Sequence, residues 1–189
     1  MSLGIAIKNK NEIYYGVDMQ CTYGDYKDKT DYKMFMPKGC KETIILCSGA
    51  LRTAQVLKAS ENLIDESKFC FDYIATDFIK NVCSALKENQ VNIDTTADSY
   101  LPLNFILINK KKAFRVDSFG YITDIETNGF LTIGSGDETA RAVLLTLKET
   151  GNFEDTENAM KTAFDICRKM HTSIGMGTKI CKYEKNNKE

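Results

Sequence analysis

The sequence is poor in the residues that many catalytic and metal-binding sites require. It has one histidine, no tryptophan and two prolines in 189 residues. Its seven cysteines are odd in number, scattered and never arranged as Cys-x-x-Cys. Zinc sites need clustered cysteine and histidine, so this pattern predicts free thiols and neither a metal nor another cofactor. A disulfide-stabilised secreted scaffold is disfavoured too, because such scaffolds are smaller and denser in cysteine.

An excess of charge and long apolar runs are missing as well. Lys+Arg total 25 and Asp+Glu total 26, which leaves a formal net charge of −1. A neutral chain lacks the basic surface that attracts nucleic acids or anionic lipids, so we expect no nucleic-acid or membrane partner. No apolar stretch approaches the roughly 20 residues of a membrane-spanning helix. The first residues lack the basic-then-apolar pattern of a secretory leader, so we expect none. We therefore expect a cytoplasmic protein.

Hydrophobic periodicity predicts strands and helices in separate groups. An apolar strand begins at Leu3, almost at the start of the sequence, where most chains keep a polar tail. It forms a predicted hairpin with the next strand around the polar stretch KNKN, and residues 21–31 are polar and turn-rich. The predicted strands are 3–7, 12–19, 32–37, 43–49, 101–110, 111–125, 129–136 and 178–185, and the predicted helices are 50–66, 71–89, 137–150 and 155–170, with a loop over 89–99.

Strands grouped with strands and helices with helices indicate stacked layers rather than alternating βαβ units. We predict an α+β fold, a four-layer αββα sandwich in which two mostly antiparallel sheets lie between helix pairs. We find no repeat or linker, so residues 1–185 are expected to form one domain, followed by a charged tail over 186–189.

Three sequence motifs, taken in chain order, resemble those of one protein family. The first motif is YYGVDMQCTYG, in which an apolar run ends in Asp18 and Gly24 follows six residues later. The second is YKMF, which carries Lys33. The third is TIGSGDETARAVLLTL, which places Ser135 in a turn that opens a helix. From about Leu3 to Tyr183 the chain resembles β-type proteasome subunits and the related bacterial heat-shock-locus peptidase. These are N-terminal-nucleophile hydrolases with a four-layer αββα fold.

The resemblance implies a mechanism. In this family a hydroxyl on the first mature residue is the nucleophile and that residue's own α-amine is the base. An α-amine has a pKa of about 7.7–8.0, so roughly a tenth or more of it is unprotonated and able to act as a base at neutral pH. Transferred to this sequence, Ser2 is the nucleophile once Met1 is removed, Lys33 stabilises the alkoxide, Asp18 holds Lys33, and Ser135 binds near the amine. The activity implied is that of a threonine/serine-type peptidase.

Three departures from the family favour an inactive relative. Met1 blocks the Ser2 amine, and another native start would change the residue there. Leu46 stands where the family has the glycine whose N–H serves the oxyanion, so a bulky side chain would crowd the pocket, and the next glycine is Gly49. In MHTSIGMG, His171 takes the place of a supporting aspartate, with Ser173 and Gly175 near the positions of a serine and a glycine. His171 also suits an ordinary role at a helix C-terminus.

Two functions therefore remain open. One is peptide-bond hydrolysis by an N-terminal hydroxyl. The other is a catalytically silent ring, scaffold or peptide-binding subunit, in which Asp18 and Lys33 are a plain inter-strand ion pair and Ser135 is a turn residue. The resemblance also implies a homo-oligomer, with rings among the family's assemblies, a peptide or unfolded-protein substrate, and an ATPase among the candidate partners.

Overall fold

The computed structural model describes residues 2–10, 12–91, 93, 101–110 and 112–183. One sheet has four strands in the order β10-β1-β2-β11, all paired antiparallel. They are β1 (Leu3–Asn9), β2 (Glu12–Asp18), β10 (Phe130–Gly134) and β11 (Thr178–Tyr183). Asn9 pairs with Glu12, which confirms the hairpin predicted around KNKN.

The second sheet has five antiparallel strands in the order β5-β6-β7-β8-β9. They are β5 (Met34–Phe35), β6 (Ile44–Gly49), β7 (Leu103–Ile108), β8 (Ala113–Val116) and β9 (Ile122–Asp124). The single strand predicted over 111–125 is wrong, because the Asp117 carboxylate accepts the N–H groups of Phe119 and Tyr121 and closes a turn between β8 and β9. The predicted strand 32–37 is reduced to two residues.

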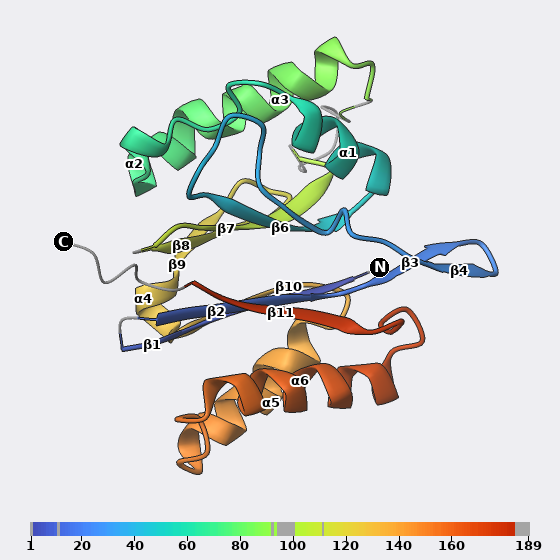
Figure 1. Ribbon diagram of the computed structural model, residues 1–189, viewed down its shortest axis with the longest axis vertical. Coiled ribbons are helices and arrows are strands. Elements are labelled where there is room, and N and C mark those ends of the chain that lie inside the picture. Colours follow the sequence, from blue (N-terminus) through green and yellow to red (C-terminus); the bar gives the residue numbers. More distant parts are fainter. Residues whose placement is uncertain (1, 11, 92, 94–100, 111, 184–189) are drawn as a thin grey trace.

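The helices depart from the prediction mainly at their ends. The helices α1 (Leu51–Ala59), α2 (Phe71–Tyr73) and α3 (Ile79–Glu88) cover the outer face of the second sheet (Figure 1). A 3-10 turn over Glu66–Lys68 precedes α2, and a π-helical segment over Ile74–Phe78 joins α2 to α3. The helix predicted to reach residue 66 ends seven residues earlier. The short helix α4 (Ile125–Asn128) was not predicted, whereas α5 (Asp137–Glu149) and α6 (Thr156–Met170) match their predicted ranges within a residue.

Three apolar clusters show how these elements stack. One joins α1, α2 and α3 to the five-stranded sheet, one lies between the two sheets, and one joins the four-stranded sheet to α5 and α6. Figure 1 shows the same arrangement, with the two sheets in the middle and helices on both outer sides. The predicted α+β class with two antiparallel sheets is confirmed. In the described part of the chain no helix has the length and apolar character needed to cross a membrane.

A second hairpin projects from the body of the molecule. Strands β3 (Gln20–Tyr23) and β4 (Tyr26–Lys29) form their own two-stranded sheet in the stretch that was predicted only as polar and turn-rich. In Figure 1 the hairpin extends beyond the sheets at the end where β1 begins. Most of the predicted loop 89–99, and the tail 186–189, lie outside the described residues.

Candidate active site

The start of β1 lies in the interior between the two sheets. Ser2 is only 4% exposed, and the next residue, Leu3, donates its backbone N–H to Asp18 Oδ1 at 2.7 Å. Pairing of Gly4 with Val17 on one side and Ile133 on the other holds this end of β1 in register. The strand therefore starts at residue 3 because both its neighbours and a buried carboxylate fix it there.

Asp18 and Lys33 form a buried ion pair next to Ser2. Lys33 Nζ lies 3.0 Å from Oδ1 and 2.9 Å from Oδ2 of Asp18. Lys33 is 5% exposed and Asp18 is 1% exposed. Asp18 Oδ2 also accepts the Gln20 N–H, at 3.1 Å. Lys33 comes just before β5, and its carbonyl accepts the Cys47 N–H at 2.9 Å, which joins it to β6. One carboxylate thus links β1, the β2–β3 junction and the edge of the second sheet.

Ser135 lies on the other side of Ser2. Its hydroxyl donates to the Ser2 carbonyl oxygen at 3.4 Å and lies 3.3 Å from the Ser173 hydroxyl. The preceding residue, Gly134, has φ +101°, and a Cβ there would lie 2.0 Å from the Ser2 oxygen. A glycine is therefore required for β10 to pass this close to the start of β1.

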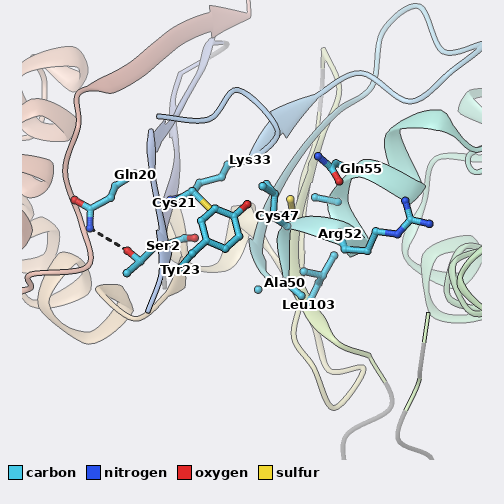
Figure 2. A pocket seen from close by; sticks show the side chains of 14 residues that line it. Ser2, Gln20, Cys21, Tyr23, Lys33, Cys47, Ala50, Arg52, Gln55 and Leu103 are labelled. Atoms are coloured by element: carbon cyan, nitrogen blue, oxygen red, sulfur yellow. Dashed lines mark hydrogen bonds between the residues drawn. The ribbon is translucent and has the colours of Figure 1, made fainter. Parts of the chain in front are cut away.

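A pocket of about 410 Å³, which we call pocket A, opens beside Ser2. Figure 2 shows Gln20, Tyr23 and Ser2 on one side of it, and Cys47, Leu103 and two α1 residues, Arg52 and Gln55, on the other. A second pocket of about 260 Å³, pocket B, is lined by Ser2, Ser48, Gly49, Asn104, Arg115, Gly134, Ser135 and Asp137. The two pockets share Ser2 and Gly49.

The side chain of Leu46 lines neither pocket. It is fully buried, pairs with Met34 across β5 and β6, and packs in the cluster between the sheets, so it does not crowd either pocket. Gly49, the last residue of β6, is the glycine that lines both pockets. The expectation that the Leu46 side chain crowds the pocket is therefore wrong, whereas a role of the Leu46 backbone N–H toward an oxyanion stays a prediction.

His171 is the C-cap residue of α6, and its Nε2 lies 2.9 Å from the Thr139 hydroxyl on α5. It lines neither pocket. The segment that follows it contacts the site instead: the Thr172 carbonyl accepts a bond from the Gln20 amide, and Ser173 reaches Ser135. In this position His171 joins two helices rather than contacting Ser2.

Cys21 and Cys47 both line pocket A, and Cys47 is the buried one of the two. Burial raises its pKa to about 12, although the neighbouring Lys33 charge acts in the opposite direction. Its hydrogen stays on sulfur at neutral pH, so Cys47 is not a nucleophile there. Among the described residues no group of three or more His, Cys, Asp or Glu side chains is arranged to hold a metal ion. The arrangement is suited to acyl transfer by a hydroxyl, next to a buried cation.

Several solved structures share this architecture. BPH from Thiobacillus denitrificans, in complex with epoxomicin, aligns with a TM-score of 0.76 and 16% identity over 95% of this chain and 97% of that one. Eukaryotic HslV from Trypanosoma brucei aligns with a TM-score of 0.67 and 17% identity over 95% and 98%. Both are proteasome-type N-terminal-nucleophile hydrolases. The chain has the proteasome-type fold.

Anbu, an ancestral β-subunit from Yersinia bercovieri, has the same proteasome-type fold and aligns with a TM-score of 0.70 and 12% identity over 96% of this chain and 81% of that one. No protein-family model and no curated protein matches the sequence. The resemblance drawn from the three motifs is confirmed at the level of the fold, which is what likeness at such low identity establishes.

Proposed function

We propose that the chain is a proteasome-like peptidase that cleaves peptide bonds with the Ser2 hydroxyl. The observation that supports this most is the junction of Ser2, Asp18 and Lys33, since a buried ammonium is held beside the start of the chain by a buried carboxylate. We also infer the complete four-layer αββα organisation of this hydrolase class, in a single domain over residues 1–185.

In the proposed mechanism, removal of Met1 frees the Ser2 α-amine. The amine takes the hydroxyl proton, the oxygen attacks the peptide carbonyl, and the Lys33 ammonium stabilises the negative charge on the attacking oxygen. The backbone N–H at Gly49 is our candidate for the oxyanion donor, because this residue lines both pockets. The α-amine then passes its proton to the leaving amine, and water releases the acyl group.

The test compares a chain without Met1 against one that retains it. We expect fluorogenic peptides to be cleaved only by the first. Ser2→Ala and Lys33→Ala should each abolish this turnover, whereas Lys80→Ala, an exposed lysine on α3, is the matched control that retains it. Epoxomicin, bound in the BPH structure, offers a probe that does not depend on the choice of peptide. Absence of turnover in both chains at high enzyme concentration, together with absence of epoxomicin binding, would exclude the proposal.

The alternative is a catalytically silent ring, scaffold or peptide-binding subunit. His171 favours it, because this residue replaces a supporting aspartate of the family and bonds to Thr139 instead of approaching Ser2. The alternative predicts a folded, assembling chain that binds peptides in pocket A but does not cleave them after Met1 is removed. Quantitative peptide binding alongside the turnover assay separates the two functions.

We further propose that the protein self-associates, acts on peptides or unfolded proteins in the cytoplasm, and works with an ATPase. The Anbu complex from Pseudomonas aeruginosa forms a helical assembly, which makes self-association of this fold a reasonable expectation. Light scattering should give a mass several times 21.3 kDa. A monomer mass at micromolar concentration would contradict self-association without affecting the hydrolase proposal.

A further inference from the structure

The inner faces of the two sheets change from apolar to polar at the end that holds Ser2. Leu46, Ile106 and Ile133 belong to the cluster between the sheets. Alternate residues of a strand share a face, so this face continues to Ser48 on β6, to Asn104 on β7 and to Ser135 after β10. The side chains keep alternating between the two faces of each strand, and those on the inner face change from apolar to polar.

Ser48 and Asn104 are directly opposite each other in the pairing of β6 with β7. Such pairs hold their Cβ atoms about 4.5–5.5 Å apart on one face of the sheet. The Ser48 residue is 4% exposed, and its hydroxyl has no hydrogen-bond partner among the described residues. Asn104 Oδ1 accepts the Ser118 N–H at 3.0 Å, which leaves the amide nitrogen as the end that can donate elsewhere. Buried hydroxyl groups are normally bonded, so Ser48 indicates a missing partner.

Ser48 and Asn104 line pocket B, where both present hydrogen-bond donors without a partner in the described part of the chain. Ser48, Asn104 and Arg115 can donate hydrogen bonds into it, whereas the hydroxyl hydrogen of Ser135 is already directed at the Ser2 carbonyl. The carboxylate in the pocket, Asp137, is already engaged by Arg115 at 3.3 Å and by the Thr132 hydroxyl. A group that carries oxygen acceptors therefore complements this pocket better than an apolar or cationic group.

Both pockets meet at Ser2 and Gly49, so a peptide whose carbonyl is attacked by Ser2 extends into each of them. Pocket A is larger and its wall includes Ala50, Leu51, Ala54 and Leu103, which suits the side chain on the acyl side. Pocket B lies beside Ser135, whose hydroxyl contacts the Ser2 backbone. Building on the function proposed above, we propose that pocket B binds the residue immediately after the cleaved bond and selects asparagine or aspartate there.

The test uses internally quenched peptides that differ only in the residue after the cleaved bond: Asn, Asp, Leu or Lys. With the chain lacking Met1, kcat/KM should be about tenfold higher for Asn than for Leu, which has a similar shape without the acceptor. Asn104→Leu should bring this ratio to about one, and Ser48→Ala should lower it in part. Asn152→Leu, an exposed asparagine after α5, is the matched control and keeps the ratio near ten.

Binding of short peptides that begin with Asn or Leu, measured by calorimetry, gives a readout that needs no catalysis. Cleavage without preference after the bond, or a preference that Asn104→Leu leaves intact, overturns the assignment of pocket B while the hydrolase proposal stands. The assignment of pocket B is also overturned if the enzyme selects only the residue before the cleaved bond. Tighter binding of the Asn peptide that is lost in Asn104→Leu, without any cleavage, supports the subsite and excludes the hydrolase. Equal binding without cleavage overturns both.

Discussion

Asp18 binds the Lys33 ammonium with both carboxylate oxygens while one of them also accepts the Leu3 N–H. Loss of the cation would leave a buried carboxylate with no compensating charge, and removal of one member of a buried pair typically costs about 3–5 kcal/mol. We predict a loss of this size in the free energy of unfolding of Lys33→Met, measured by urea denaturation.

The control for that variant is Lys38→Met, because the Lys38–Glu61 pair is exposed. Exposed pairs contribute about 0–1 kcal/mol, so little change is expected. The double variant Asp18→Asn with Lys33→Met should lose less stability than the two single losses added together. Equal effects of Lys33→Met and Lys38→Met would show that the pair is not buried in solution.

Gly134 provides a steric test of how closely β10 approaches β1. In Gly134→Ala the new Cβ would lie 2.0 Å from the Ser2 oxygen, at φ +101°. We predict strong destabilisation and loss of any peptidase activity, because the start of β1 must move. Gly151→Ala is matched, since its φ is +75° and nothing lies within 4 Å of the Cβ position. That change should cost only the strain of the left-handed backbone, about 1–2 kcal/mol. Thermal unfolding of both variants decides this, and similar melting temperatures would contradict the close approach.

Cys47 should resist alkylation in the folded protein. Its pKa is raised to about 12 by burial, so at pH 8 almost none of it is thiolate. Cys70 is exposed and serves as the internal reference. We predict that iodoacetamide at pH 8 labels Cys70 much faster than Cys47, by peptide mass spectrometry, and that the difference disappears in urea. Rapid labelling of Cys47 in the native protein would mean that pocket A exposes it.

Tyr15 and Tyr183 should make the fold sensitive to alkaline pH. Burial raises the pKa of each to about 12, above the usual value of about 10. The folded state disfavours the phenolate. The contribution of the two neutral tyrosines to the free energy of unfolding is therefore complete below pH 10 and is lost as the pH rises through 12. Urea denaturation at pH 8 and pH 11 should show the decrease, and Tyr183→Phe should make it smaller. An unchanged decrease in Tyr183→Phe would assign the effect to other groups.

The sequence predicted what depends on short-range pattern. Apolar alternation fixed the β1–β2 hairpin, and helical spacing gave α5 and α6 within a residue. It missed the β3–β4 hairpin, because a strand that projects from the body buries little and carries no apolar alternation to detect. It also missed the end of α1, whose apolar spacing continues beyond Ala59 although the chain leaves the helix at Ser60.

Part of the candidate site followed from spacing and part did not. Asp18, Lys33 and Ser135 were selected from three motifs, and the structure places all three around Ser2. The Leu46 side chain was expected to crowd the pocket but packs between the sheets, because counting along β6 cannot tell which residue faces a pocket and which faces the interior. Pocket B was not predicted, since it is formed by residues from β6, β7 and β10 that only the stacking of two sheets brings together.

The start of β1 is fastened through main-chain atoms: the Leu3 N–H to Asp18 and the Ser2 carbonyl to Ser135. The side chain at position 2 takes no part in either bond. A lineage with this architecture is thus free to exchange one small hydroxyl or thiol for another there, or to discard it, without dismantling the scaffold. In such a molecule the side chain that would react and the contacts that stabilise the fold are provided by different atoms.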